Sequence, residues 1–256
     1  MYPAAVRLGF RMRISVVDFL NARPLTWGLL TRPPSGVEVS RDMPSVCAEK
    51  LADGRAEAGL IPSIEFPRIP GLVRVEGLGI AAESEVRSVL LVSNVSREKI
   101  GTLNLDPASR TSAALARILL KRRYGIEPRI VATGEPADAE LVIGDPALKV
   151  RLKGRVILDL AAEWRSLTGY PFVFAFWAVR KEFWEERFRE LFRESYRRGI
   201  EDFDALVASE VQTSGGGLSP ALVEDYLRHC LHYELTEADE AGLALFYQMA
   251  REDGLA

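Results

Sequence analysis

The stretch Ile14-Ser15-Val16-Val17-Asp18-Phe19-Leu20-Asn21-Ala22-Arg23-Pro24-Leu25 sets the pattern for the whole chain. Its apolar beginning predicts a strand over Arg13–Val17, and its polar middle predicts a loop that opens a helix near Thr26. Ligands of α/β proteins bind where strands end in such loops, because the free N–H groups and positive dipole of a helix start favour anions. We therefore expect Asn21 on the floor of a ligand cleft; the alternative is that its side chain stabilises its own turn.

The composition is that of an ordinary globular chain. Its 256 residues, 48% hydrophobic and 27% charged, suffice for one large domain or two small ones. The net charge of −3 provides no basic field for nucleic acid, so an acidic ligand would need local positive groups. No apolar run reaches the roughly 18–20 residues that cross a membrane, and residues 1–11 do not resemble a secretory signal. We expect a cytoplasmic protein whose first eleven residues are either a frayed extension or an artefact of start-codon choice.

Strands and helices alternate along most of the chain. Helical patterns cover Ser45–Asp53 and Ala113–Tyr124, and the pattern stays helical from Lys181 to the end, with a capping box at Thr236. Such alternation predicts mostly parallel sheets. Short apolar runs bounded by turn residues predict strands at Arg13–Val17, Val37–Ser40, Ala58–Ile61, Leu72–Ile80, Arg87–Ser93, Thr102–Leu105, Ile130–Val131, Leu141–Ile143, Val156–Leu160 and Phe172–Arg180.

The order of these elements predicts an α/β protein of two lobes with mixed sheets. Lobe one comprises residues 12–93 and 172–256, including the terminal helices, and lobe two comprises residues 94–171. The chain then crosses between the lobes near Ser93–Ser96 and near Pro171–Phe172. Two crossings form a hinge, and the cleft between two lobes is a natural ligand site.

Polar clusters end several of these strands. Hydroxyl groups at a helix start can together hold a carboxylate, although a plain N-cap is the alternative. Arg110 either pairs with an anion through its planar guanidinium or faces solvent. Asp145 fits an acid–base group, an orienting group or a turn residue, and Ser88 at a strand start fits a structural or a functional role. The four clusters are Asn21, Pro62-Ser63, Ser109-Arg110-Thr111-Ser112 and Gly144-Asp145.

Several kinds of site lose support. There is no G-x-G-x-x-G after a strand, no P-loop motif and no G-x-S-x-G, so dinucleotide, nucleotide and hydrolase sites are not predicted. The two histidines, His229 and His232, could share a helix face, but no further metal-ligand motif accompanies them. The two cysteines, Cys47 and Cys230, are far apart and are expected to be free thiols. We expect neither a metal ion nor a cofactor, so an enzyme here would act by positioning and by groups on its substrate.

Five motifs, taken in order, resemble the chorismate dehydratase family, whose members open the futalosine route to menaquinone. The resemblance runs from about Met12 to the C-terminal helices. It implies the two-lobed fold of type II periplasmic binding proteins, and an activity that removes water from chorismate to give 3-[(1-carboxyvinyl)oxy]benzoate. The motifs are Phe19-Leu20-Asn21-Ala22-Arg23-Pro24-Leu25, Leu60-Ile61-Pro62-Ser63-Ile64-Glu65, Arg87-Ser88-Val89, Ser109-Arg110-Thr111-Ser112 and Ile143-Gly144-Asp145-Pro146-Ala147-Leu148.

The resemblance also implies roles for individual residues. Asn21 and Ser88 would contact the enolpyruvyl carboxylate of chorismate, and Thr111 and Ser112 would suit its ring carboxylate. That enolpyruvyl carboxylate would itself act as the base, and loss of the C3 proton and the C4 hydroxyl would make the ring aromatic. A catalytic histidine is then unnecessary. The remaining residues expected in the substrate site are Ser63, Ser109, Arg110, Gly144 and Asp145.

Two alternatives remain open. Dihydroxynaphthoate synthase, a later enzyme of the same pathway, shares the fold but uses a catalytic histidine in its second lobe, and residues 94–171 contain none. The other alternative is a non-catalytic binding protein for small carboxylates. Its oligomeric state, like that of the enzyme, cannot be read from the sequence.

Overall fold

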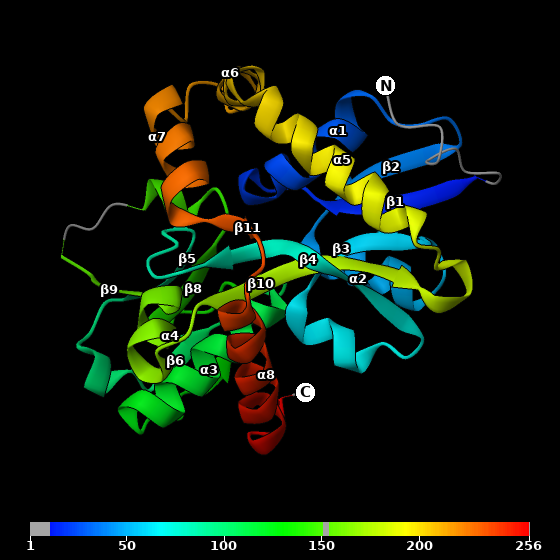
Figure 1. The fold of residues 1–256 in the computed structure, drawn as a ribbon. Coiled ribbons are helices and arrows are strands. Elements are labelled where there is room, and N and C mark those ends of the chain that lie inside the picture. Colours follow the sequence, from blue (N-terminus) through cyan, green and yellow to red (C-terminus); the bar gives the residue numbers. More distant parts are fainter. Residues whose placement is uncertain (1–10, 151–153, 256) are drawn as a thin grey trace.

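The computed structural model describes residues 11–150 and 154–255, which form two mixed sheets with helices packed around them (Figure 1). Of the first eleven residues, for which a frayed extension was one expectation, residues 1–10 lie outside this range. The larger sheet has the strand order β11-β4-β10-β3-β1-β2, with β1 parallel to β2 and β3, and β10 antiparallel to β3 and β4. Its strands, in that order, are His232–Glu234, Leu72–Ala82, Phe172–Arg180, Ala58–Pro62, Met12–Val17 and Val37–Asp42.

The smaller sheet has the order β7-β6-β8-β5-β9. Here β6 is parallel to β7 and β8, whereas β5 is antiparallel to β8 and β9. We call the part built on the larger sheet the first lobe and the part built on the smaller sheet the second lobe. The strands of the smaller sheet, in order, are Arg129–Val131, Thr102–Asn104, Ala139–Ile143, Val89–Ser93 and Val156–Asp159.

In the described part of the chain, four of the eight α-helices begin at a residue whose side chain accepts from a free N–H group of the first turn. Ser109 caps α3 (Arg110–Tyr124), Asp159 caps α4 (Leu160–Thr168), Ser219 caps α7 (Pro220–Asp225), and Thr236 forms the predicted capping box of α8 (Glu237–Glu252). A 3₁₀ turn, η2 (Leu20–Ala22), leads into α1, and a π-helix, η7 (Tyr226–Cys230), follows α7. The α-helices are Arg23–Thr31, Pro44–Ala52, Arg110–Tyr124, Leu160–Thr168, Arg187–Glu201, Phe203–Thr213, Pro220–Asp225 and Glu237–Glu252, for α1 to α8 in order.

The first crossing between the sheets lies earlier than the sequence predicts. Because β5 pairs with β8 and β9, the chain leaves the larger sheet after β4 and crosses over residues 83–88. The prediction of a crossing near Ser93–Ser96 is therefore wrong. A fully buried apolar strand such as β5 fits either sheet equally well, so its composition does not reveal its partners. The chain returns to the larger sheet between α4 and β10, and we propose lobe boundaries at these two crossings.

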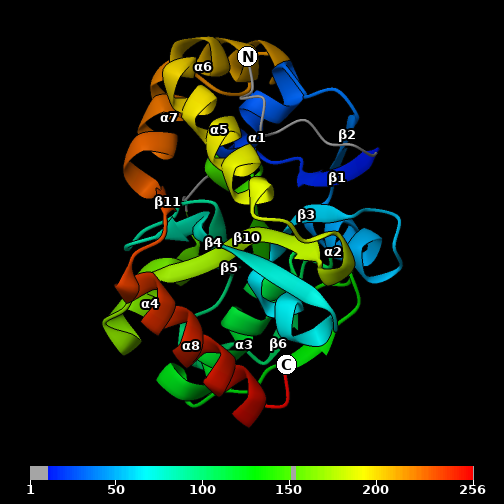
Figure 2. The ribbon, with the colours of Figure 1, turned by 45° about the vertical axis from the view of Figure 1, so that its right-hand side comes forward.

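The C-terminal region departs from its prediction in two ways. It is not helical throughout, because β11 pairs with β4, and His232 therefore lies in a strand while His229 lies in η7. The predicted shared helix face of the two histidines is wrong, and His232 Nε2 instead contacts Asp239 Oδ1 at 2.8 Å. In addition, α8 packs against both β10 and α3, so it touches both lobes (Figure 2).

Three further features of the described residues bear on function: the cysteines, clusters of possible metal ligands, and helices long enough to cross a membrane. Cys47 and Cys230 are free and buried, as predicted. No group of three or more His, Cys, Asp or Glu side chains within residues 11–150 and 154–255 is arranged to hold a metal ion. In the same ranges, no helix combines the length and the apolar character that a membrane span requires.

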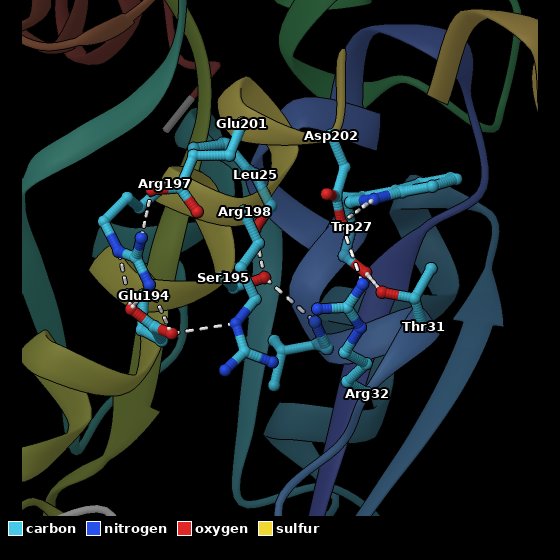
Figure 3. A network of polar contacts seen from close by, with 11 residues as sticks. Leu25, Trp27, Thr31, Arg32, Glu194, Ser195, Arg197, Arg198, Glu201 and Asp202 are labelled. Atoms are coloured by element: carbon cyan, nitrogen blue, oxygen red, sulfur yellow. Dashed lines mark hydrogen bonds and ion pairs between the residues drawn. The ribbon is translucent and has the colours of Figure 1, made fainter. Parts of the chain in front are cut away.

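Helix α5 lies across α1 and packs closely against it (Figure 1). A Cβ atom added at Gly199 of α5 would stand 2.1 Å from the carbonyl oxygen of Pro24, so the contact requires glycine. Ser195 Oγ donates to Leu25 O at 2.8 Å and accepts from Leu29 N at 3.1 Å, within the polar network of Figure 3. Because α1 begins directly after η2, the turn that carries Asn21, this packing also fixes that turn.

Candidate functional site

A small cavity lies between the two lobes. Its volume is about 40 Å³. Five of the nine predicted site residues line it: Asn21, Ser88, Ser109, Ser112 and Gly144. The rest of its wall is apolar and comes from both lobes and from the start of α2: Val17, Phe19, Pro44, Pro62, Ile80, Val89, Ile143, Phe174 and Ala175.

Asn21 lies in η2, between β1 and α1. Its Oδ1 atom is buried, and within the described part of the chain it has no hydrogen-bond partner. The turn is held instead by the backbone, since Ala22 N donates to Phe19 O at 3.1 Å. A buried acceptor without a partner costs about 1–3 kcal/mol, so this atom favours a ligand that brings a donor into the cavity.

Ser88 lies at the end of the first crossing and is fully buried. Its Oγ accepts a hydrogen bond of 2.6 Å from the phenol of Tyr226. Its neighbour Arg87 has φ 58°, the only positive value for a non-glycine residue over residues 11–150 and 154–255. Val86 N and Arg87 N both donate to Asp159 Oδ2, at 3.0 and 2.6 Å. The carboxylate that caps α4 thus holds this strained backbone in place, next to the cavity.

The start of α3 contributes two hydroxyl groups to the cavity. Ser109 caps the helix by accepting from Ser112 N, and its Oγ donates to Ser112 Oγ at 2.7 Å. The plain N-cap is therefore present, and both hydroxyls also line the cavity. Pro44 at the start of α2 and Asn21 just before α1 do so too. Three helix N-termini thus meet at a cavity whose lining includes no charged side chain among the described residues, and their dipoles favour an anion there.

Ser63 and Thr111 lie behind the cavity wall and join the lobes. Both are buried. Thr111 Oγ1 accepts from Ile64 N at 3.1 Å and lies 3.4 Å from Ser63 Oγ, which donates to Val173 O at 2.8 Å. These hydroxyls are therefore occupied by contacts within the protein, and a role for them in substrate binding stays a prediction.

Arg110 is held outside the cavity by two carboxylates. Its guanidinium pairs with Glu65 at 3.0 Å and with Glu49 at 2.7 Å. Both partners belong to the first lobe, whereas Arg110 begins α3 of the second lobe. These ion pairs therefore connect the lobes. The guanidinium is turned toward the two carboxylates and does not line the cavity.

Asp145 also connects the lobes. Its Oδ1 accepts from Leu20 N at 3.0 Å, which ties the end of β8 to the turn that carries Asn21. Burial raises the pKa of Asp145, while the Leu20 N–H and the positive charges of Arg23 and Lys149 act in the opposite direction. The preceding Gly144 has φ 65°, and a Cβ there would stand 3.0 Å from the ring of Phe19. Gly144-Asp145 therefore fits closely over the Asn21 turn.

Comparison with known proteins places this chain in a family. Residues 12–252 match the family model described as menaquinone biosynthesis. The chain belongs to this menaquinone biosynthesis family. It is 36% identical to a chorismate dehydratase of Campylobacter jejuni over 173 residues, which cover 65% of this chain and 67% of the relative. It is 27% identical to a chorismate dehydratase of Thermus thermophilus over 235 residues, covering 82% and 86%. The resemblance seen in the sequence motifs is confirmed.

Solved structures confirm the predicted fold of this menaquinone biosynthesis family member. Protein AF1704 from Archaeoglobus fulgidus superposes with a TM-score of 0.77 at 18% identity, over 96% of this chain and 98% of that one. The periplasmic aliphatic sulphonate binding protein SsuA from Escherichia coli gives 0.65 at 16% identity, over 97% and 89%. Both likenesses concern the fold alone, which is that of the two-lobed periplasmic binding proteins.

Three aromatic residues of the family member's site were not predicted as site residues. Phe19 and Phe174 line the cavity, and Tyr226 contacts Ser88 from behind. Phe19 begins the first of the five family motifs, but a ring at this position could have packed in the core equally well. Phe174 lies in a strand whose residues are nearly all buried, so no alternation marks the face that meets the cavity. Tyr226 is 138 positions from Ser88, and no local pattern links the two.

The pKa of Asp145 leads to a prediction about stability. Since burial raises this pKa above its ordinary value of 3.8, the folded protein holds the proton over a pH range in which the unfolded chain has lost it. The contribution of Asp145 to stability therefore falls as pH rises through that range. We expect Asp145→Asn to be at least as stable as the wild type at pH 7, with an advantage that shrinks toward pH 4.

Thermal unfolding of both proteins from pH 4 to pH 7 measures this difference. Asp145→Ala is the control, because it removes the acceptor of Leu20 N and is expected to be less stable by about 1–3 kcal/mol at neutral pH. A wild-type protein that gains stability over Asp145→Asn as pH rises would show that the carboxylate is stabilised, not penalised, where it lies.

Proposed function

We propose that this protein is a chorismate dehydratase, which removes water from chorismate to give 3-[(1-carboxyvinyl)oxy]benzoate. The observation that carries the proposal is the cavity itself. It offers three serine hydroxyls, an asparagine oxygen and three helix N-termini in an apolar surround. Among the described residues, that oxygen has no hydrogen-bond partner and the lining has no charged side chain. These features suit a ligand with carboxylates, a hydroxyl group and an apolar ring. The two chorismate dehydratases among its relatives support the same activity.

Asn21 and Ser88 position the side-chain carboxylate of chorismate. Ser88 donates its hydroxyl hydrogen and Asn21 its Nδ2–H, while Asn21 Oδ1 is available to the C4 hydroxyl, a donor that the substrate carries. Ser109 and Ser112, with the dipole of α3, suit the ring carboxylate. Of the pair expected from the family resemblance, Ser112 keeps this role and Ser109 takes the place of Thr111, which lies behind the wall.

The reaction then needs no protein base. The side-chain carboxylate removes the C3 proton, the C3–H electrons form the new ring double bond, and the C4–O bond breaks with the ring becoming aromatic. The proton leaves with the C4 oxygen as water. The protein's contribution is to hold the carboxylate at the proton and to exclude bulk water, and such positioning is worth several kcal/mol of the barrier, up to about 7–11 in favourable cases.

The size of the cavity requires the lobes to move. A volume of about 40 Å³ holds a few water molecules at most. Pockets that take small-molecule ligands are usually several hundred Å³. The substrate therefore enters an open form, in which the contacts of Asp145 with Leu20 and of Thr111 with Ile64 are broken, and the lobes close over it.

Incubation of the purified protein with chorismate tests the proposal. We expect the absorbance of the ring diene to disappear, and a product lighter by one water to accumulate. Binding of chorismate without conversion would overturn the dehydratase and favour a non-catalytic carboxylate-binding protein. Dihydroxynaphthoate synthase has less support, because both histidines, His229 and His232, lie outside the cavity lining. We also propose a cytoplasmic location, which fractionation of cells that express the full chain tests.

A further inference from the structure

We propose that Tyr226 is a positioning residue, which fixes the hydroxyl group of Ser88 and makes it a hydrogen-bond donor toward the substrate. The inference rests on the proposed function, since it assigns a role in the same site. Tyr226 is the first residue of η7, the π-helix that follows α7. Single π-helical turns are rare, and they often occur at functional sites.

The contact between the two side chains is buried. Tyr226 is 1% exposed and Ser88 is 0% exposed, and the phenol oxygen lies 2.6 Å from Ser88 Oγ. Burial raises the pKa of Tyr226, so the phenol keeps its proton at neutral pH. Over the described ranges, Ser88 Oγ is the one hydrogen-bond partner of the phenol. The phenol therefore donates, and Ser88 Oγ accepts.

This arrangement turns the hydrogen of Ser88 away from Tyr226 and leaves it for another acceptor. A serine hydroxyl has one hydrogen and two lone pairs, and Tyr226 occupies one lone pair. No other hydrogen bond of the Ser88 side chain is formed within residues 11–150 and 154–255. Because Ser88 lines the cavity, its hydrogen can be satisfied by an acceptor there, such as a carboxylate oxygen. A hydroxyl that accepts one hydrogen bond also donates more strongly, since bonds in a chain polarise one another.

The backbone of Ser88 is fixed independently. Asp159 holds the N–H groups of Val86 and Arg87, so the chain reaches Ser88 in a single conformation. With the backbone held by Asp159, the side-chain torsion of Ser88 and the rotation of its hydroxyl remain free. The hydrogen bond from Tyr226 restricts both before the substrate binds.

A purely structural phenol is the competing explanation, and the chain offers a matched control for it. Tyr233 in β11 is also buried, at 4% exposure, and its hydroxyl has no hydrogen-bond partner in the described part of the chain. Tyr226→Phe and Tyr233→Phe delete the same atom from buried surroundings. Only the first of them removes a contact with Ser88.

The test measures kcat, KM, the Kd of chorismate and the thermal unfolding of Tyr226→Phe, Tyr233→Phe, Ser88→Ala and the double variant Ser88→Ala/Tyr226→Phe. We expect Tyr226→Phe to lower kcat by about tenfold, a loss typical of one hydrogen bond, with a smaller change in KM. In the Ser88→Ala background it should change kcat by less than about twofold, because residues that act through one another are not additive. Tyr233→Phe should match the wild type.

Each other outcome overturns part of the account. Equal losses of kcat from Tyr226→Phe in both backgrounds, or none in either, would overturn the role of Tyr226. A wild-type protein that binds chorismate without converting it would overturn the proposed dehydratase activity but not the role of Tyr226. The wild type, the two single variants and the double variant would then be compared by their Kd for chorismate. A wild type that neither binds nor converts chorismate would overturn both.

A wild-type structure with the product bound avoids the variants altogether, should Tyr226→Phe not fold. The proposal requires Ser88 Oγ to lie within hydrogen-bond distance of both the Tyr226 phenol and a carboxylate oxygen of the product. A Ser88 hydroxyl that contacts Tyr226 but no ligand oxygen would contradict it.

Discussion

Replacement of Asn21 or Ser88 by alanine is expected to lower kcat for chorismate dehydration by about 100-fold or more, since removal of one preorganised hydrogen-bonding group from an active site has an effect of that size. The two variants should differ in stability. Asn21 Oδ1 is buried and has no hydrogen-bond partner among the described residues, so its removal should leave the protein as stable as the wild type or more stable by about 1 kcal/mol. Ser88→Ala leaves the phenol of Tyr226 without its acceptor and should be slightly destabilising.

Steady-state kinetics and chemical denaturation of both variants measure these effects. Asn94→Ala, at an exposed position in the second lobe, controls for the loss of an asparagine side chain. Full turnover by both Asn21→Ala and Ser88→Ala would remove them from the active site. A large loss of stability in Asn21→Ala would show that its side chain supports the turn after all.

Gly199→Ala should lower the free energy of unfolding more than the variants of Asn21, Ser88 and Asp145 do. Alanine in place of glycine inside a helix normally stabilises it by up to about 1 kcal/mol. Here the new Cβ would stand 2.1 Å from Pro24 O, a backbone atom that can move only if α1 moves. Overpacking of this kind costs typically about 1–3 kcal/mol and occasionally more. We expect a loss at the upper end of that range, with a reduced kcat, because α1 begins directly after the Asn21 turn.

Urea denaturation and chorismate turnover of Gly199→Ala check this expectation. Gly101→Ala is the control, since a Cβ there would meet its nearest atom, Asp138 Oδ2, at an ordinary 3.4 Å. If both variants unfold at the same urea concentration, the close packing of α1 on α5 does not limit stability.

All strands of this fold except β11 were readable from the sequence, because most are short apolar runs between turn residues. Their partners were not, as β5 illustrates. Its five residues are all buried, and nothing in such a run tells which sheet contains it. The wrong sheet for β5 also misplaces Ser88, which lies in the crossing between the lobes and not within a strand of the first lobe.

The candidate site was predictable to the extent that polar residues follow strands. That rule brings Asn21, Ser109 and Gly144 to the cavity wall, because strand ends and helix starts meet there. It does not separate residues that face the cavity from those one step behind it, such as Thr111, whose hydroxyl binds Ile64 N instead. Tyr226 could not be found at all, because its contact with Ser88 depends on how the C-terminal region returns to the lobes.

A crystal structure of Asn21→Ala soaked with chorismate tests the central claim most directly, since the variant should bind the substrate and convert it slowly. We predict intact chorismate in the cavity between the lobes, with its side-chain carboxylate within hydrogen-bond distance of Ser88 Oγ and its ring carboxylate at the start of α3. Chorismate bound elsewhere on the molecule, or bound in the cavity with neither carboxylate near Ser88, would contradict the account.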